Sequence, residues 1–377
     1  MLEDIYGDTP PTSISSFYSD IMKISRAALY VVATTLGAAA LSDKGQQYLD
    51  HAINATGTLN NVWYNEDSGI WQDLWWQSGN ILETISDLCF LSESTCGQVE
   101  DMLVNTYTAA QGIYPGFVND FYDDESWWAL GWIRAYDVAQ NETYLKQAQS
   151  IFDDMVGGYN ATCGGHWWNK AKTANTAIGN GLFLSVAAQL ANRRSKDPAY
   201  YLNWALAEWE WFNQSGLIND RHLINDGLDL TTCKNNKAAT FTYNQGVVIG
   251  ALVALNEAQD GGPDSDYLRT AGLIADATIT DLTDANGILT EAGSADPDVT
   301  GAQFKGVFLR NLQKLQQTRP QQNFVDFIQA NADSLWERAR DAPSGFVGPA
   351  WAGPFYTATA ASQCSAIDCL VAAAAVS

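Results

Sequence analysis

Positive charge is scarce in this sequence of 377 residues. It contains 20 Lys and Arg against 43 Asp and Glu, which gives a formal net charge of -23 at pH 7. Nucleic acids and anionic membrane surfaces are bound through basic patches, so the charge balance argues against both kinds of partner. It fits a neutral or cationic partner and says nothing more specific about the substrate.

Histidine is almost absent, since His51, His166 and His222 are the only three. A Ser-His-Asp type of nucleophile therefore has little support, and the sequence also lacks a nucleophile-elbow motif. No Cys-x-x-Cys pair occurs, which argues against a structural zinc site. No glycine-rich segment has the spacing of a phosphate-binding loop. We expect neither a metal nor a cofactor.

Cysteine is present in an even number, and six cysteines fit three disulfides in an oxidising compartment. The short spacings favour two local bridges and leave one longer bridge, although sequence alone leaves other pairings open. The expected pairs are Cys89–Cys96, Cys364–Cys369 and Cys163–Cys233.

Near the N-terminus lies a pattern typical of a secretory signal peptide. A basic start at 22–26 is followed by an apolar run at 27–37 and then by three alanines. The run is too short for a transmembrane helix. We expect residues 1–41 to be an extension plus signal peptide, with either a long segment before the signal or a true start at Met22. The alternative is an ordinary buried helix from Ile21 to Leu41.

Four Asn-x-Ser/Thr sequons add to the prediction of a secreted glycoprotein. They begin at Asn54, Asn141, Asn160 and Asn213. The last stretch, from Ile367 to Ser377, is rich in alanine and lacks the polar spacer and long apolar tail of an anchor signal. It is better interpreted as a final helix, so we expect a freely secreted protein, with association to a cell wall as the alternative.

Long runs of alternating apolar residues are missing, so few strands are expected. Helix starts are marked by Asp, Ser, Thr or Pro, and helix ends by Gly or Asn. Twelve helices without a linker-like break predict one all-α domain at 42–377, an (α/α)6 toroid of two concentric rings of six helices. The expected helices are 43–62, 73–91, 97–111, 124–140, 142–156, 172–193, 197–214, 241–258, 265–281, 301–317, 320–340 and 355–374. The helix 124–140, apolar nearly all round, belongs in the inner ring, and 197–214 belongs in the outer ring.

Aromatic residues, in contrast, are abundant, with 14 Trp and 16 Tyr. Core packing explains aromatic pairs in general. A carbohydrate-binding cleft is a more specific interpretation than core packing, because sugars stack their C–H faces on aromatic rings and offer hydroxyls to amides and carboxylates. Polar residues after two of the Trp pairs favour the cleft. The pairs are Trp75-Trp76, Trp127-Trp128 and Trp167-Trp168.

Two adjacent acids, Asp123 and Asp124, open the apolar helix predicted at 124–140. Taken alone, they could be a helix cap with a second acid at the positive helix end. Their aromatic surroundings favour a glycosidase, in which one carboxyl group protonates the leaving oxygen and the other attacks the sugar or activates water. Adjacent side chains fit the retaining separation of about 5–5.5 Å better than the wider inverting one. The charge of one acid also raises the pKa of its neighbour.

Other acids in the sequence have weaker claims to a catalytic role. Asp153-Asp154 comes late in a predicted helix and is expected on a solvated face. Asp87, Glu93 and Glu142 lack an aromatic context. His166, in Gly-Gly-His-Trp-Trp, is either a hydrogen-bond donor to substrate or a packing residue, and packing is favoured.

Several motifs resemble those of glycoside hydrolase family 76, the α-1,6-mannanases of bacteria and fungi. The central one is Phe-Tyr-Asp-Asp-Glu-Ser-Trp-Trp-Ala-Leu-Gly-Trp at 121–132. Similar segments follow in the family's order, over roughly residues 42–360. They are Trp75-Trp76-Gln77-Ser78-Gly79-Asn80, the stretch from Cys163 to Asn169, Asn175 to Asn180, Thr242 to Gly246, and Gln303 to Arg310.

The resemblance implies an (α/α)6 fold, no metal, and retaining endo-hydrolysis of α-1,6-linked mannan. By position, Asp123 is the implied nucleophile and Asp124 the implied acid/base. A departure occurs at His166, where family members often carry an apolar residue, and this affects the expected subsite specificity. The expected substrate-binding residues are Trp75, Trp76, Asn80, Trp127, Trp128, His166, Trp168, Asn175, Asp226, Tyr243, Asn244, Gln245 and Lys305.

Four functional hypotheses follow. The first is a secreted, monomeric endo-α-1,6-mannanase that acts on α-1,6-mannan or mannoprotein glycans. The second is a cell-wall transglycosidase using the same site, as in fungal relatives of the family. The third is a non-catalytic mannan-binding protein, which would not need two adjacent carboxylates. The fourth is an (α/α)6 glycosidase acting on uronides, which the net charge of -23 and the scarcity of Arg near the motifs disfavour.

Overall fold

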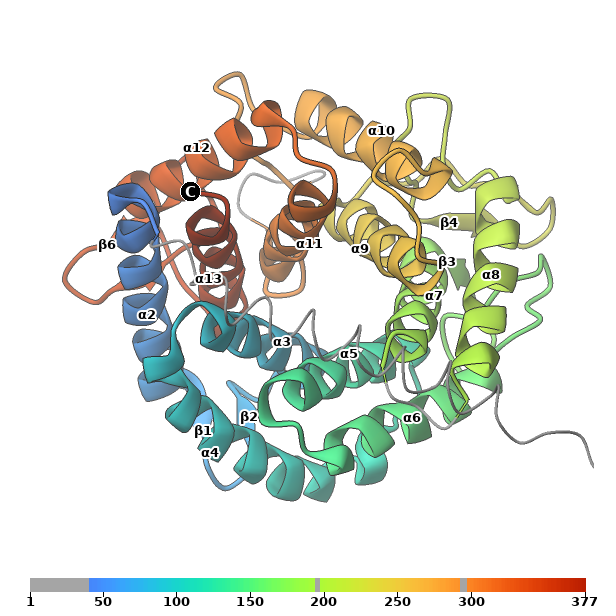
Figure 1. The fold of residues 1–377 in the computed structure, drawn as a ribbon, viewed down its shortest axis with the longest axis horizontal. Helices are drawn as coiled ribbons and strands as arrows, with labels where there is room; N and C mark the ends of the chain where they lie inside the picture. Colours follow the sequence, from blue (N-terminus) through green and yellow to red (C-terminus); the bar gives the residue numbers. More distant parts are fainter. Residues whose placement is uncertain (1–40, 194–196, 292–296) are drawn as a thin grey trace, which may run out of the picture. The chain divides into compact units, whose positions relative to one another are not determined.

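Helices alternate along the chain between an inner and an outer ring (Figure 1). The computed structural model describes residues 41–193, 197–291 and 297–377. Within it, Asp43–Ser377 form one unit, which is described here by itself. Almost all of the predicted extension and signal peptide, up to residue 40, lies outside the described residues.

Six helices form the inner ring, and each of them packs against the next inner helix (Figure 1). They are buried on most sides, which explains why their sequences are apolar nearly all round. The inner helices are α3 (Trp75–Leu91), α5 (Tyr122–Ala139), α7 (Ala177–Ala191), α9 (Thr242–Ala258), α11 (Phe304–Thr318) and α13 (Ala360–Ala375).

Six further helices form the outer ring, each packed on an inner neighbour. They bury one face and expose the other, as amphipathic surface helices do. The outer helices are α2 (Asp43–Trp63), α4 (Glu93–Ala109), α6 (Glu142–Val156), α8 (Pro198–Gln214), α10 (Asp266–Asp281) and α12 (Gln322–Arg338). The predicted (α/α)6 toroid is therefore confirmed, and so are the inner position of α5 and the outer position of α8.

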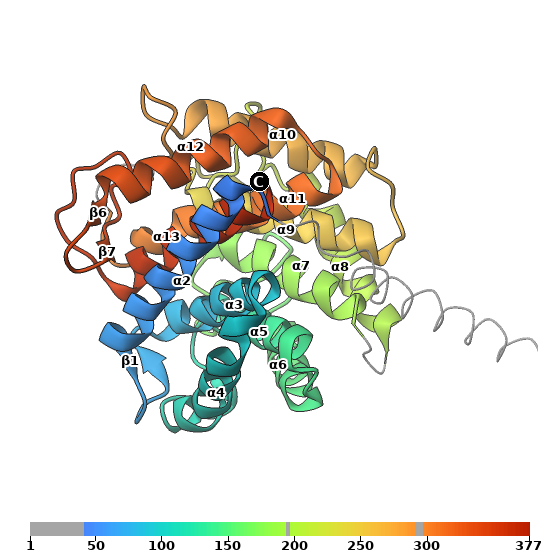
Figure 2. The same cartoon turned by 60° about the vertical axis from the view of Figure 1, so that its left-hand side comes forward.

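The first and last helices of the described chain close both rings. α13 packs against α2, α3, α11 and α12, and the side chain of Gln363 donates to the carbonyl of Ala55 at 3.1 Å. Figure 2 shows α2 and α13 side by side. The predicted final helix is thus a structural member of the inner ring.

Glycine allows a close helix contact in the inner ring, between α3 and α5. A Cβ atom on Gly79 would lie 2.9 Å from the backbone nitrogen of Trp128, and one on Gly131 would lie 2.5 Å from the carbonyl oxygen of Gly79. Any larger residue at either position would push the helices apart. This approach brings the N-terminal end of α3 next to that of α5.

Strands are few and short, as expected. In the described part of the chain they form two hairpins and one three-stranded antiparallel sheet. The hairpins are β1 (Tyr64–Asn65) with β2 (Ile70–Trp71) and β6 (Arg340–Asp341) with β7 (Phe346–Val347), and the sheet is β3 (Asn175–Thr176), β4 (Gly227–Asp229) and β5 (Lys234–Asn235). Among the described helices, none is long and apolar enough to cross a membrane.

Two of the three predicted disulfides are present, Cys89–Cys96 and Cys163–Cys233. The predicted bridge between Cys364 and Cys369 is wrong, because both cysteines are free and buried. Residues five apart on an α-helix are rotated by about 140° from each other. On α13, Cys364 accordingly contacts the Thr84 hydroxyl on α3 at 3.2 Å, whereas Cys369 faces the carbonyl of Ile328 on α12.

At the end of the toroid where the inner helices terminate, a cavity of about 310 Å³ opens. Charged side chains from five inner-ring segments line it, namely Asp87, Arg134, Arg193, Glu257 and Lys314. Arg134 pairs with Asp87, with Nε 2.5 Å from Oδ1. Neither acid of the Asp123-Asp124 pair lines this cavity, so it is separate from the site described next.

Candidate active site

The N-terminal ends of the inner helices carry a connected row of aromatic rings. Trp76 of α3 has its ring centroid 5.7 Å from that of Trp127 on α5 and 6.2 Å from that of Phe304 on α11. Phe304 in turn stacks on Tyr243 of α9 at 3.6 Å. Four inner helices therefore contribute to one aromatic surface.

Asp123 and Asp124 lie in the first turn of α5, at the same end of the toroid. The helix begins at Tyr122, and its N-cap residue is Phe121, with no side-chain cap hydrogen bond. Neither acid therefore serves as the N-cap of α5, which removes the capping explanation of the Asp-Asp dipeptide. Both side chains are only partly buried, so they can meet a ligand.

Each acid has one carboxylate oxygen held by a neutral N–H donor from a loop. The indole Nε1 of Trp168 donates to Oδ2 of Asp123 at 2.8 Å. The amide of Asn119 donates to Oδ2 of Asp124, also at 2.8 Å. The other oxygen of Asp123, Oδ1, is buried without a hydrogen-bond partner. The pair is thus oriented from two sides, and Oδ1 of Asp123 is left without a donor.

Burial shifts both acids toward the protonated form. Burial, together with the neighbouring charge of Asp124, raises the pKa of Asp123 to about 7. Burial also raises the pKa of Asp124, to about 6, although the Asn119 hydrogen bond opposes this shift. Near neutral pH the pair can therefore hold one proton between two carboxyl groups, which is what an acid and a nucleophile on one sugar require.

A third carboxyl group, that of Asp226, lies in the loop between α8 and α9. It accepts a 3.3 Å hydrogen bond from Asn244, and burial raises its pKa. Burial also raises the pKa of Tyr243, and the charges of Asp226 and Asp123 add to that shift. The charges of Asp226 and Asp123 thus both act on Tyr243, and Asn244 bonds Asp226, so these side chains lie near one another.

Glu125 and its partner Lys170 lie next to the aspartate pair. Glu125 follows Asp124 on α5 and is fully buried. Lys170 lies 2.8 Å from Glu125 and 2.9 Å from Asp154 of α6. Asp153 is exposed, but Asp154 is only partly so and joins this ion pair. The prediction of a solvated face therefore holds for Asp153 and is wrong for Asp154.

Two polar residues expected at the substrate lie in the interior. Asn80 is fully buried and accepts a hydrogen bond from Arg310. His166 is also fully buried, and its ring nitrogens lie 2.7 Å from the carbonyl of Trp167 and 2.5 Å from that of Met155. Burial lowers the pKa of His166 to about 4. The packing interpretation of His166 is therefore the one that the structure supports.

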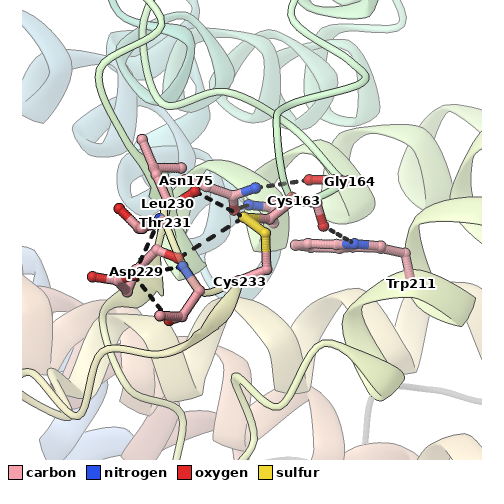
Figure 3. The surroundings of a disulfide bond; sticks show 10 residues. Cys163, Gly164, Asn175, Trp211, Asp229, Leu230, Thr231 and Cys233 are labelled. Carbon is pink, nitrogen blue, oxygen red and sulfur yellow. Dashed lines mark hydrogen bonds between the residues drawn. A yellow bond between two sulfur atoms is a disulfide. The ribbon is translucent and has the colours of Figure 1, made fainter.

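Three more of the expected residues make internal contacts. Asn175 is buried and donates to the carbonyl of Gly164, beside the Cys163–Cys233 disulfide (Figure 3). Gln245 is buried and bonds both the N–H and the C=O of Ile224. Lys305 is buried, with its ammonium 2.5 Å from the carbonyl of Pro349. These side chains shape the loops around the site rather than joining the Asp123 group.

The tryptophan pairs divide between the site and the core. Trp76 is half-buried in the aromatic row, whereas Trp75 packs against Trp128 at 4.7 Å and Tyr114 at 4.8 Å. Trp128 is fully buried. Trp127, also buried, packs against Trp76. Adjacent residues on a helix point about 100° apart, so in the two helical pairs Trp76 meets Trp127 in the aromatic row, whereas Trp75 meets Trp128. The third pair lies in a loop, where Trp167 is buried and Trp168 donates to Asp123.

Two residues of the site escaped the sequence analysis. Phe304 lies at the centre of the aromatic row, one position before the expected Lys305. Asn119 orients Asp124 from the loop before α5. A single Phe at a helix start and a single Asn in a loop have no local signature. In the part of the chain that is described, no three His, Cys, Asp or Glu side chains come together as metal ligands would.

Comparison with known proteins settles the family. The profile of glycosyl hydrolase family 76 matches residues 50–376. The chain belongs to glycosyl hydrolase family 76. It is accordingly a member of a family of glycoside hydrolases, and the motifs that suggested the resemblance lie within the matched range.

Two curated relatives match over part of the chain. A putative mannan endo-1,6-alpha-mannosidase of Schizosaccharomyces pombe is 26% identical over 175 residues, 42% of this chain and 37% of the relative. The mannan endo-1,6-alpha-mannosidase DFG5 of Saccharomyces cerevisiae is 25% identical over 211 residues, 50% of this chain and 45% of the relative. The chain thus spans less than half the length of each.

Solved structures share the family 76 fold over most of the chain. An inactive variant of an alpha-1,6-mannanase of Salegentibacter, in complex with alpha-1,6-mannotetrose, has a TM-score of 0.77 at 21% identity, over 88% of this chain and 99% of the other. Dfg5 of Chaetomium thermophilum, in complex with glucosamine, has a TM-score of 0.75 at 17% identity, over 89% and 91%. At these identities the likeness concerns the fold.

Proposed function

We propose that this protein is a retaining endo-α-1,6-mannosidase that cleaves internal bonds of α-1,6-linked mannan. One observation carries the proposal: two adjacent carboxyl groups with raised pKa values lie at the end of the inner ring that carries the aromatic row, and each has one oxygen held by a neutral donor. The family of the chain and the names of its curated relatives support mannan as the substrate.

In this mechanism Asp123 is the nucleophile. The Trp168 indole holds Oδ2, so Oδ1 is the oxygen that bonds to the anomeric carbon. Asp124 donates its proton to the departing glycosidic oxygen, so the released chain leaves with a hydroxyl group. It then takes a proton from the water that breaks the glycosyl ester on Asp123. Both displacements invert the anomeric carbon, and the product keeps the α configuration.

The proton distribution in the unliganded site runs against this order, since Asp123 has the higher pKa. The assignment therefore follows the position of each acid in the family's Asp-Asp motif, because each acid has one oxygen held by a donor and the geometry is similar for both. A bound sugar places its leaving oxygen beside one carboxyl group only and fixes the proton there. An activated mannoside with a good leaving group distinguishes the nucleophile from the acid. Its leaving group departs without being protonated, so the first step no longer needs the acid.

The direct test uses linear α-1,6-mannan oligosaccharides with wild type, Asp123→Asn and Asp124→Asn. We expect shorter products of retained α configuration, and loss of turnover by a factor of about 10³ or more in both variants, since acid–base help alone contributes about 10²–10⁴. With the activated mannoside, Asp124→Asn should still form the glycosyl-enzyme, whereas Asp123→Asn should not. Products of inverted configuration, or full activity in either variant, would refute the mechanism.

A transglycosidase on the same site is the second candidate. Glucosamine is bound in the solved Dfg5 structure of similar fold, and transfer differs from hydrolysis only in which hydroxyl attacks the glycosyl ester. Products longer than the substrate would identify transfer. Binding of oligosaccharide without turnover in the wild type would instead favour a non-catalytic mannan-binding protein.

We further propose that the protein is secreted and glycosylated, and that it acts as a monomer. All four sequon asparagines are exposed, and two disulfides are formed. The side chains lie on the outer-ring helices α2 and α8 and on the chain before and after α6. Mass shifts after enzymatic deglycosylation of the secreted protein, together with light scattering, test these points.

A further inference from the structure

The segment that carries Trp168 is fastened to the start of α5. The N–H of Tyr122 donates to the carbonyl of Trp168, and the N–H of Lys170 donates to that of Asp120, both at 3.0 Å. Phe121 and Asn169 thereby form an antiparallel bridge. Residues 168–170, termed the Trp168 segment, thus run alongside the residues that lead into the Asp123-Asp124 pair.

Lys170 adds ion pairs to these backbone contacts. Its ammonium lies 2.8 Å from Oε1 of the fully buried Glu125 and 2.9 Å from Oδ2 of Asp154. It also lies 5.6 Å from the ring of Tyr122. Glu125, Asp154 and Tyr122 are therefore the titratable groups that face it, from α5 and α6. The proposed catalytic steps use none of these groups.

We propose that Lys170 is a positioning residue that ties the Trp168 segment to α5 and α6 and so holds the Trp168 indole on Oδ2 of Asp123. The kinetic part of this inference rests on the proposed function, whereas its structural part does not. Two backbone hydrogen bonds fix the pairing of the segment. The ion pairs fix how closely it lies against the helix that carries both acids.

The geometry explains why small movements would matter. Trp168 lies two residues before Lys170, and its N–H reaches Asp123, two residues before Glu125. The ion pair and the indole hydrogen bond thus connect the same two segments on either side of the backbone bridge. If the ion pair is lost, the indole can turn away, and the oxygen that attacks the sugar loses its fixed direction. Misplacement by about 1 Å can cost about 10²-fold in rate.

Removal of Lys170 should still permit folding at mildly acidic pH. Burial raises the pKa of Glu125 to about 8, even against the opposing charge of Lys170. At pH 6 Glu125 is therefore largely neutral with or without Lys170, and in the wild type the 2.8 Å contact is then a hydrogen bond from the ammonium. Lys170→Met can therefore be studied at that pH. Lys170→Met combined with Glu125→Gln removes both partners of the buried contact and provides a second variant in which only the partly exposed Asp154 loses a partner.

The kinetic experiment compares these variants at pH 6 on α-1,6-mannan oligosaccharides. We expect Lys170→Met and the double variant to lower kcat on the order of 10²-fold with little change in KM, and Lys170→Arg to recover most of the loss. Asp153→Asn is the matched control, because Asp153 is the exposed neighbour of Asp154, and it should match the wild type. A raised KM with unchanged kcat would overturn the inference.

A second readout needs no activity. The indole N–H signal of Trp168, identified in 15N-tryptophan-labelled protein by its absence from Trp168→Phe, should move when Asp123 titrates and when Asp123→Asn is introduced. In Lys170→Met the signal should lose this response while the other indole signals stay in place. An unchanged Trp168 signal in Lys170→Met would overturn the inference. Failure of the wild type to cleave mannan would refute the proposed function. The Trp168 signal would still test whether Lys170 positions the indole.

Discussion

The side-chain amide of Asn119 bridges the backbone at the start of α5 and the carboxylate of Asp124. Its carbonyl accepts from the N–H of Phe121 at 2.9 Å, and its NH₂ group donates to Oδ2 of Asp124 at 2.8 Å. Because the backbone contact fixes the orientation of the amide, the donor stays aimed at Asp124. The hydrogen bond favours the charged carboxylate and so opposes the rise in its pKa that burial causes.

Asn119→Ala should raise the pKa of Asp124 further. The acid limb of the kcat/KM profile should then move to higher pH, and kcat/KM on that limb should fall by about tenfold for each pH unit of the shift. Full pH profiles of wild type and variant check this. Asn323→Ala, which removes an Asn–Asp hydrogen bond on the surface between α12 and α10, should leave the profile unchanged. An unchanged acid limb in Asn119→Ala would contradict the role of this amide.

The wild-type profile of kcat/KM should itself be bell-shaped, with a maximum between about pH 6 and 7. Below the lower pKa of the pair, about 6, both acids are protonated and no nucleophile exists; above the higher, about 7, both are ionised and no acid remains. These values belong to the pair rather than to either residue. A flat profile from pH 5 to 8 would show that the two acids do not act as a coupled pair.

Asn80 and Arg310 should govern stability rather than substrate binding. Arg310 is buried between Asp368 at 2.8 Å and Glu83 at 3.2 Å, and it also donates to Asn80. Arg310→Met leaves the buried Asp368 without its cation, while Glu83 keeps Lys314 at 2.7 Å, and should lower the free energy of unfolding by about 3–5 kcal/mol. Asn80→Ala should lower it by about 1–3 kcal/mol. Denaturant unfolding gives both values, and a raised KM for Asn80→Ala at unchanged stability would restore its predicted role in binding.

The two disulfides should differ in their contribution to stability. Cys163–Cys233 closes a loop with a sequence separation of 70, against 7 for Cys89–Cys96. Loop-closure entropy predicts losses of about 4 and about 2 kcal/mol when each is removed. Cys163→Ser with Cys233→Ser should therefore lower the Tm more than Cys89→Ser with Cys96→Ser. Equal shifts would show that the loop between Cys163 and Cys233 stays ordered without its bridge (Figure 3).

The free thiols of Cys364 and Cys369 give a direct check on the disulfide assignment. Both are fully buried in the inner ring, so a thiol reagent should label neither cysteine in the native protein. After denaturation without reductant, the reagent should label both. Peptide mapping with an alkylating agent locates the labelled residues, and their absence from the labelled set would mean that a third bridge forms.

The sequence predicted the helical architecture well because its signals are local. The helix predicted at 142–156 has these bounds in the structure, as α6. Where the prediction failed, a distant partner decided. The helix expected from 172 begins at Ala177, because Asn175 and Thr176 pair with β4, about fifty residues later. Such pairing leaves no trace in the periodicity of the segment itself.

The site was predictable in part for the same reason. The Asp-Asp dipeptide is a local signal, and so are the tryptophan pairs. Neighbouring residues on a helix point about 100° apart. The family-like segment from Gln303 to Arg310 therefore does not by itself tell whether Phe304 or Lys305 joins the aromatic row. The donors Trp168 and Asn119 are set by loop conformation, and only Trp168 had an aromatic motif to mark it.

The closure of both rings by α2 and α13 has a consequence for how the protein is made. The side chain of Gln363 bonds the carbonyl of Ala55 across 308 positions of the chain. During synthesis, the apolar faces of α2 and the start of α3 that α13 covers therefore stay exposed until α13 has left the ribosome. Contacts of such long range slow folding and prolong exposure to aggregation. We expect newly made chains to depend on chaperones until the last inner helix arrives.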